Sequence, residues 1–343
     1  MNAVLPTEAD QRYLDTRQAF DSVAGEYRGP LGNNRPVQAM RAVLWRTVLE
    51  TTAPGGRLLD LGCGAGLDAV YFAGQGYQVE AIDWSPEMVA QTRRTAEEQG
   101  VTDRVTAVNV GIHELSQLSR ISRQRIERAD ADCVRGASFQ PAVSLTSSQQ
   151  GVRNNPEARK LETCDTADWK SAPRTEDLAG VEKCVPPGTS FDCIYSDLGA
   201  LNCVGDLDTV ARDCQRLLKP GGKLVFSVIG RHCPWELAYY GLHWNWPRAT
   251  LRWKSGPVPV GLNGHTVWTR YYSPREFYHF FTSRFTWQSC RGLNLFLPPP
   301  YLGGPFEKRP AWLKPLAWLD DHLAGLPLFN RAGDHFLLVL TPR

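Results

Sequence analysis

The chain has 343 residues, 42% of them hydrophobic, which is enough for a substantial buried core. Its net charge of +2, without a long run of Lys or Arg, argues against a nucleic-acid-binding protein. No stretch approaches the roughly 20 apolar residues of a membrane-spanning helix. The first residues lack the apolar core of a secretory signal, so we expect a cytoplasmic protein.

The nine cysteines are scattered along the chain, odd in number and without a CxxC pair. Disulfide frameworks and tetrahedral metal sites both need cysteines at paired spacing. We therefore expect reduced thiols and no metal.

Residues 1–56 carry apolar side chains at helical spacing. From residue 57, short apolar strands alternate with helices; strands are predicted at 57–62, 77–84 and 104–110 and helices at 67–76 and 85–100. Ser85 is placed to cap the second helix, and Pro86 to occupy its first position. Such alternation is typical of a parallel sheet with helices on both faces.

The alternation stops after residue 115 and returns at residue 191. Residues 116–190 are polar, mixed in charge and poor in apolar anchors, which predicts a long flexible insert; we favour a surface excursion over a functional module. The later elements, in chain order, are a strand at 191–198, a helix at 206–218, a KPGG turn at 219–222, a strand at 223–230, a helix at 273–283, and strands at 285–297 and 334–343.

Three glycines, Gly62, Gly64 and Gly66, stand where the first strand turns into a helix. Glycines leave the backbone bare, so a ligand can lie against main-chain N–H groups. Asp83 ends the next strand about 20 residues on, where a carboxylate can accept both hydroxyls of a ribose. The pattern predicts a ligand that contains a nucleoside.

The spacing does not fit a dinucleotide. That fingerprint needs its third glycine three positions after the second, and Leu67 stands there. Asp60 lies within the motif, where its carboxylate would repel a pyrophosphate and attract an ammonium group. A ribose, an adenine and an ammonium group without phosphate are parts of S-adenosylmethionine, which we predict as the cofactor.

LLDLGCGAG followed by VEAIDWSPEMV resembles the cofactor signature of class I S-adenosylmethionine-dependent methyltransferases of the small-molecule type. FDCIYSDL and LKPGGKLVFSVIG resemble the family's fourth and fifth strands, AFDSVAGEY its N-terminal closing helix and DHFLLVLTPR its antiparallel seventh strand. The resemblance implies a Rossmann-like α/β fold with a seven-stranded, mostly parallel sheet, helices on both faces and an antiparallel last strand. It divides the chain into a helical lid (1–56), a cofactor-binding core (57–115 and 191–230), the polar insert (116–190), and an aromatic cap with the last helix and strands of the core (231–343).

The resemblance also implies a cofactor site at the glycine turn and the strand ends. Its residues would be Tyr27, Asp60, Gly62, Cys63, Gly64, Gly66, Asp83, Trp84, Met88, Ile112, His113, Ser196 and Leu198. Asp83 would hold the ribose, and Tyr27 would lie near the sulfonium. After the third strand the family often has Gly-Asp, whose Asp meets the adenine amine. This chain has GIHE at 111–114, so the backbone of Ile112 or the side chain of His113 or Glu114 would take that place.

Methyl transfer from a sulfonium is an in-line displacement that chiefly needs alignment, and a base is needed only if the acceptor holds its proton. Asp197 after the fourth strand, His232 after the fifth and Tyr27 are the candidate catalytic residues. Asn202 is a candidate contact to the acceptor. The alternative for Asp197, Asn202 and His232 is a hydrogen bond to loop backbone.

Eight of the eleven tryptophans follow residue 230. They either pack a cap against the sheet or line an apolar pocket that excludes water from the acceptor. We expect Trp235, Tyr239 and Tyr271 to contact a hydrophobic or aromatic acceptor, with a lipid as one alternative. The segment 311–329 is an alternative site of peripheral membrane contact, although it has no clear basic face.

The hypothesis is therefore a cytoplasmic enzyme that moves the methyl group of S-adenosylmethionine to a small, largely apolar acceptor. A nucleic-acid methyltransferase is the first rival and predicts a basic face near the pocket. A cofactor-binding protein without turnover is the second rival, and non-methyl chemistry in the same pocket is the third.

Overall fold

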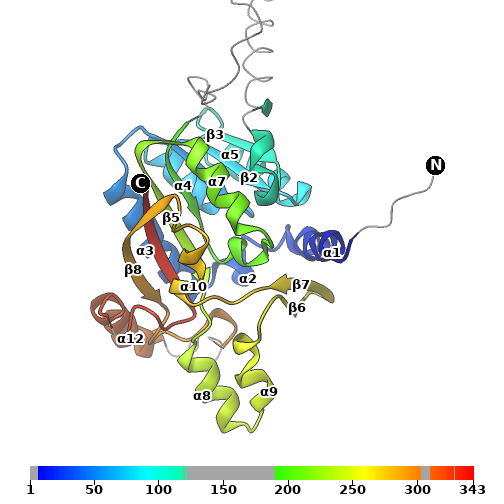
Figure 1. The fold of residues 1–343 in the computed structure, drawn as a ribbon, viewed down its shortest axis with the longest axis vertical. Coiled ribbons are helices and arrows are strands. Elements are labelled where there is room, and N and C mark those ends of the chain that lie inside the picture. The colour runs from blue at the N-terminus through cyan, green and yellow to red at the C-terminus, as the bar shows by residue number, and fades with distance from the viewer. Residues whose placement is uncertain (1–6, 119, 122–189, 303–309, 328) are drawn as a thin grey trace, which may run out of the picture. The chain divides into compact units, whose positions relative to one another are not determined.

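One seven-stranded sheet, in the order β3-β2-β1-β4-β5-β9-β8, organises the described part of the chain (Figure 1). Its strands in chain order are β1 (Arg57–Leu61), β2 (Gln78–Asp83), β3 (Val105–Asn109), β4 (Phe191–Ser196), β5 (Leu218–Ile229), β8 (Phe285–Leu293) and β9 (His335–Pro342). Strands β1 to β5 pair in parallel, and β9 runs antiparallel between β5 and β8. The predicted mostly parallel sheet with an antiparallel last strand is confirmed.

The structure is a computed structural model that describes residues 7–118, 120–121, 190–302, 310–327 and 329–343. Nearly all of the predicted insert at 116–190 lies outside these residues. The division into lid, core, insert and cap stays a prediction. Within the described ranges, no helix is long and apolar enough to cross a bilayer.

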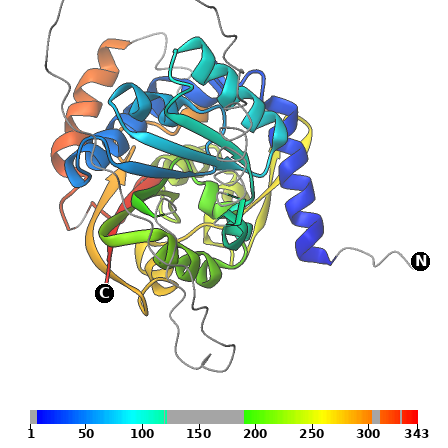
Figure 2. The same cartoon turned by 90° about the horizontal axis from the view of Figure 1, so that it is seen from above.

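Helices cover both faces of the sheet (Figure 2). One group is α3 (Arg35–Thr51), α4 (Leu67–Gly74) and α5 (Pro86–Glu98), and the other is η1 (Ile112–Gln117), α7 (Leu207–Leu217) and α10 (Pro274–His279). Successive strand residues enter opposite faces, so Leu58 packs with the first group and Leu59 with the second. Ser85 caps the N-terminus of α5 as predicted, since its hydroxyl accepts the Met88 N–H at 3.0 Å.

The chain changes its direction across the sheet between β1 and β4. β1 leads to β2 and β3 on one side, and β4 leads to β5 on the other. Ligands of such sheets bind outside the carboxyl ends of the strands at this switch point.

Segments from distant parts of the chain cover this edge. They are α1 (Glu8–Val23), α2 (Pro30–Asn33), η2 (Ala200–Cys203) and the hairpin of β6 (Val258–Leu262) and β7 (His265–Thr269). α1 packs along β7, where Trp268 donates its backbone N–H to Thr16 Oγ1 and its indole N–H to Asp15 Oδ2, both at 3.0 Å. The hairpin, which the sequence pattern did not indicate, therefore joins α1 above the site.

The remaining elements are α8 (Pro234–Leu242), α9 (Trp246–Ala249), η3 (Leu251–Trp253), η4 (Pro300–Leu302) and α12 (Pro310–Leu323). α12 lies beside the edge strand β8, where Arg291 Nη2 donates to the carbonyl oxygens of Asp320 and Asp321, both at 3.0 Å. The predicted KPGG turn is instead an irregularity within β5, because Phe191 pairs with Leu218 whereas Cys193 pairs with Lys223.

Candidate functional site

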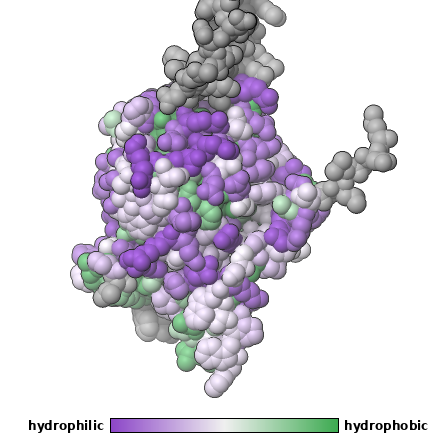
Figure 3. All heavy atoms as spheres, viewed as in Figure 1, coloured by the Kyte–Doolittle hydropathy of each residue, from purple (hydrophilic) through white to green (hydrophobic). Residues whose placement is uncertain are grey.

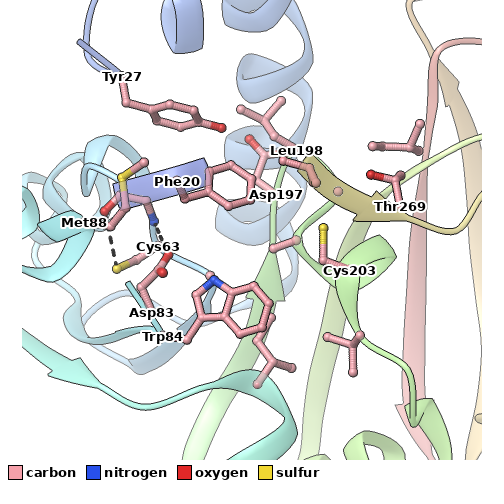
Figure 4. Close-up of a pocket in the computed structure, with 18 of the residues that line it drawn as sticks. Phe20, Tyr27, Cys63, Asp83, Trp84, Met88, Asp197, Leu198, Cys203 and Thr269 are labelled. Carbon is pink, nitrogen blue, oxygen red and sulfur yellow. Dashed lines mark hydrogen bonds between the residues drawn. The ribbon is translucent and has the colours of Figure 1, made fainter. Parts of the chain in front are cut away.

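A cavity of about 910 Å³, part of it open to solvent, lies at the carboxyl ends of β1, β2 and β4 (Figure 4). The predicted residues that line it are Tyr27, Gly62, Cys63, Gly64, Asp83, Trp84, Met88, Ile112, His113, Asp197 and Leu198.

The glycine turn forms one wall of the cavity. Gly62 and Gly64 have φ angles of 80° and 53°, a left-handed conformation that residues with side chains disfavour. A Cβ on Gly62 would stand 2.4 Å from the Cβ of Ala200, and one on Gly64 would stand 3.3 Å from the Tyr27 ring. The Ile82 carbonyl oxygen accepts the Gly62 N–H at 2.9 Å and fixes the turn from behind. The turn therefore needs glycine both for its backbone conformation and for its close packing on Ala200 and Tyr27.

Asp83, at the end of β2, is bonded to this turn. Its Oδ2 accepts the Gly64 N–H at 3.0 Å, and its Oδ1 accepts the Ser85 N–H at 2.9 Å. Burial raises the pKa of Asp83 to about 6, although these hydrogen bonds oppose the rise. Each carboxylate oxygen has further acceptor capacity, so the two hydroxyls of a ribose can still bind to Asp83.

Three aromatic rings pack together where Trp84 and His113 line the cavity. Tyr13 of α1 stacks on His113 with ring centroids 4.4 Å apart, and Trp84 meets these rings edge-on at 5.5 and 5.8 Å. The Tyr13 hydroxyl accepts the Gly205 N–H at 3.0 Å, which ties α1 to the segment after η2. Burial lowers the pKa of His113, so its ring is neutral near pH 7. Sequence analysis missed Tyr13, since nothing in its helix singles it out.

Four buried charged residues come together on the same side of the sheet: Arg41, Asp60, Asp68 and Asp197. Arg41 Nε lies 3.9 Å from both Asp68 Oδ1 and Asp197 Oδ2. Among the described residues, Arg41 Nε and Nη1, Asp60 Oδ2 and both carboxylate oxygens of Asp197 have no hydrogen-bond partner. Buried polar atoms are rarely left unbonded, so these are the atoms that a polar ligand can satisfy.

The pKa values of these buried groups show which candidate catalytic residue can act as a base. Burial, helped by the Asp68 carboxylate and opposed by Arg41, raises the pKa of Asp197 to about 6. Burial also raises the pKa of Asp60 well above its usual value and the pKa of Tyr27 to about 12. At neutral pH Asp197 can accept a proton, whereas the Tyr27 hydroxyl stays protonated and cannot act as a base.

Sequence analysis missed Arg41 and Asp68. The signal for Arg41 was present, because it lies on the helix face of Val37, Leu44 and Val48, where a cation is out of place. Asp68 gives no comparable signal, since acids are common in the first turn of a helix.

Much of the cavity lining is apolar. Figure 4 shows Cys203 and Thr269 opposite Asp83 and Met88. The apolar lining residues that sequence analysis did not name are Phe20, Ala200, Val204, Ile229 and Val267. They come from α1, η2 and its following residue, β5 and β7, so this apolar lining exists only once these elements have packed.

Three predicted cofactor residues do not line the cavity. Ser196 is fully buried, and its hydroxyl donates to the Leu61 carbonyl oxygen at 2.8 Å within the sheet. Gly66 begins α4 at φ 79°, packed against Thr92. Asp60 is buried below the turn. The prediction for the Ser196 side chain is wrong, because its hydroxyl is already bonded inside the sheet.

The predicted acceptor contact Asn202 is a structural residue. Its side-chain amide donates to the carbonyl oxygens of Ile229 at 3.1 Å and Arg270 at 2.7 Å, and its oxygen accepts the Ile229 N–H at 2.8 Å. Asn202 therefore bonds to loop backbone, which was the alternative to the predicted contact with the acceptor.

Replacing Asn202 by alanine should lower the free energy of unfolding by about 1–3 kcal/mol, because buried backbone groups of Ile229 and Arg270 lose their partner. Urea denaturation measures this loss. The affinity for S-adenosylhomocysteine should stay within about twofold of the wild type. A normal stability with altered acceptor preference would restore the original prediction.

The other predicted acceptor or catalytic residues after β5 also lie away from the cavity. His232 is exposed, and the Trp235 indole N–H donates to a backbone carbonyl oxygen at 3.0 Å. Tyr239 is 43% exposed, and Tyr271 lies under a guanidinium group 5.2 Å from its ring centroid. The predicted roles of these four residues are therefore wrong. The chain after β5 leads away into α8 and α9, and β7 supplies part of the cavity lining instead.

The sequence matches the family described as "Methyltransferase domain" over residues 34–284. It is 32% identical over 102 residues to the ubiquinone biosynthesis O-methyltransferase of Xanthomonas axonopodis pv. citri (strain 306), covering 29% of this chain and 43% of that protein. It is 28% identical over 101 residues to the tRNA 5-carboxymethoxyuridine methyltransferase of Escherichia coli (strain K12), covering 28% and 39%. The chain thus spans less than half the length of these curated relatives.

Among solved structures, the CcbJ methyltransferase from Streptomyces caelestis is 14% identical and has a TM-score of 0.49, covering 96% of this chain and 98% of that one. The family match covers most of the chain and includes the glycine turn and Asp83. The chain therefore belongs to the methyltransferase domain family, as a class I S-adenosylmethionine-dependent member.

Proposed function

We propose that this protein transfers the methyl group of S-adenosylmethionine to a small, largely apolar acceptor by in-line displacement. The observation that carries the proposal is the mixed lining of the cavity. Glycine backbone and buried carboxylates line it together with a set of apolar side chains.

The residues present fit the cofactor. The bare turn at Gly62 and Gly64 accommodates the methionine part, and Asp83 accepts the ribose hydroxyls. The unbonded carboxylate oxygens of Asp197 suit an ammonium group, and the unbonded N–H groups of Arg41 suit a carboxylate; both residues line the cavity. Bound there, S-adenosylmethionine supplies a methyl group that the sulfonium has already activated.

The adenine site is proposed at the lining residues Trp84, Met88, Ile112 and His113. A neutral His113 ring, held by the Tyr13 stack, offers a flat surface without competing charge. Tyr13 thereby gives α1 a direct part in closing the cofactor side.

The apolar part of the lining supports an apolar acceptor. Phe20, Val204 and Val267 offer no hydrogen bonds from their side chains, and a polar acceptor would lose its water there without replacement. An apolar acceptor gains from the same burial. Its reactive atom would then lie toward Asp197, which can take a proton if the acceptor has one to lose.

Incubation with isotope-labelled S-adenosylmethionine tests the function in three arms: an apolar metabolite extract, a polar metabolite extract and total tRNA. We expect label in the apolar arm, in a product heavier by one CH₂ unit by mass spectrometry. Label in tRNA would support the nucleic-acid rival. Cofactor binding without label in any arm would support the non-catalytic rival.

Cofactor binding should weaken as the pH falls through about 6. Burial raises the pKa of both Asp83 and Asp197 to about 6, and the ribose and ammonium contacts need the ionised carboxylates. Calorimetry with S-adenosylhomocysteine should record about a tenfold loss of affinity for each group between about pH 7 and pH 5.

The same raised pKa values have the opposite effect on the empty protein. A carboxyl group whose pKa is raised by folding stabilises the fold while protonated, and that contribution is lost as the pH rises through about 6. Asp197→Asn should therefore reduce the pH dependence of both the cofactor affinity and the free energy of unfolding. If neither pH dependence changed in this variant, Asp197 would not be one of the titrating groups.

A further inference from the structure

The turn between α8 and α9, residues 242–246, presents large apolar side chains to solvent. Leu242, Trp244 and Trp246 are 79%, 83% and 52% exposed. Figure 1 shows α8 and α9 projecting beside the β6–β7 hairpin. In Figure 3 this projection is pale and green, whereas the body is mostly purple. Exposed apolar groups gathered in one place mark an interaction surface.

An ordered backbone holds these side chains outward. The Trp244 N–H donates to the Gly241 carbonyl oxygen at 3.0 Å, and the Asn245 N–H donates to that of Tyr240 at 2.8 Å. Trp244 has a φ angle of 55°, which is uncommon for a bulky residue. Asn245 then caps α9 by accepting the Arg248 N–H at 3.3 Å. The exposure therefore belongs to a defined turn.

The base of the projection is anchored to the fold. Arg252, 4% exposed, donates from Nε to Glu236 Oε2 and from Nη2 to Asp334 Oδ1, both at 2.6 Å. These pairs hold α8 to the start of β9. They also neutralise Glu236, the acid of α8.

The projection itself carries cations and no acids. Residues 237–254, LAYYGLHWNWPRATLRWK, contain neither Asp nor Glu. Arg248 and Lys254 are exposed, and Trp253 between them is 48% exposed. Tryptophan favours the headgroup level of bilayers, and Lys and Arg are attracted to anionic lipids. Apolar tip and basic flank together fit a membrane surface rather than a neutral protein groove.

We propose that residues 237–254 dock on an anionic phospholipid bilayer. The three apolar side chains of the turn enter the headgroup region, and the two exposed cations contact lipid phosphates. α8 follows β5, whose last residue Ile229 lines the cavity, so the projection starts at the edge of the sheet that holds the site. Apolar acceptors partition into bilayers, and docking brings the cavity to them. The docking itself does not depend on methyl transfer.

Co-sedimentation of the full chain with vesicles tests the docking. The wild type should sediment with vesicles that contain about one third phosphatidylglycerol and much less with phosphatidylcholine alone. Leu242→Ser/Trp244→Ser/Trp246→Ser should lower the bound fraction by at least about tenfold. Arg248→Glu/Lys254→Glu should lower it by about fivefold per charge, on anionic vesicles only.

The matched control is Trp318→Ser/Leu326→Ser, which removes apolar side chains exposed by 58% and 47% in segment 311–329. This variant should bind as the wild type does. A loss in the control and none in the turn variant would move the contact to 311–329 and overturn the proposal. The proposal would also be overturned if the wild type bound to neither kind of vesicle, or if size-exclusion chromatography showed that it self-associates through the turn. No readout uses the cofactor, so failure here leaves the methyl-transfer proposal standing.

Discussion

Asp83→Ala should bind S-adenosylhomocysteine at least about a hundredfold more weakly than the wild type. The substitution removes the proposed ribose acceptor and also frees the Gly64 N–H, which Asp83 holds at 3.0 Å. Hydrogen bonds to a charged group contribute about 1.5–3 kcal/mol each, and two are lost to the ribose alone. Isothermal titration calorimetry near neutral pH, where Asp83 is ionised, measures the change.

Two further variants separate ribose recognition from the shape of the turn. Asp83→Asn keeps the size of the side chain and one acceptor oxygen, so it should lose less affinity for S-adenosylhomocysteine than Asp83→Ala does. Asp103→Ala removes an exposed aspartate whose side chain lies 3.6 Å from Arg104, and it should bind normally. Near-normal affinity in Asp83→Ala would place the ribose elsewhere and remove the basis of the site.

Arg41→Leu should lower both stability and cofactor affinity. Arg41 is 4% exposed and lies 3.9 Å from Asp68 and from Asp197, so leucine leaves two buried carboxylates without their cation. Breaking a buried pair in this way typically costs about 3–5 kcal/mol. The loss should shrink at lower pH, because Arg41 lowers the pKa of Asp197, and without it the carboxyl protonates more readily. Urea denaturation at two pH values measures both effects.

The same helix offers a matched control. Arg46 is half exposed and lies 3.5 Å from Asp321 at the surface, so Arg46→Leu should change stability by less than about 1 kcal/mol. Arg41→Lys keeps the charge and should recover part of the stability, which allows affinity to be measured if Arg41→Leu does not fold. Wild-type affinity in a folded Arg41→Leu protein would contradict the proposed carboxylate contact.

The sequence by itself determined the sheet and the cofactor side of the cavity, since both depend on local signals. Strands β1 to β3 are short apolar runs, and Ser85 caps the helix between two of them. Gly62, Gly64 and Asp83 belong to one strand–helix–strand unit, whose geometry fixes how far apart they lie along the chain. Parallel strands then bring their carboxyl ends to one edge.

The tertiary structure alone decided the apolar lining, where we propose that the acceptor binds. Val267 and Thr269 reach the cavity because β7 packs on α1, and Trp268 bonds to Thr16 across 252 positions. His232 and Tyr239, although close in sequence to the end of β5, lie outside the cavity. Hydropathy and spacing show which residues are apolar, but which segment covers a sheet edge depends on long-range packing that local patterns do not encode. Arg41 joins the site for the same reason, since its charge matters only beside carboxylates from α4 and the end of β4.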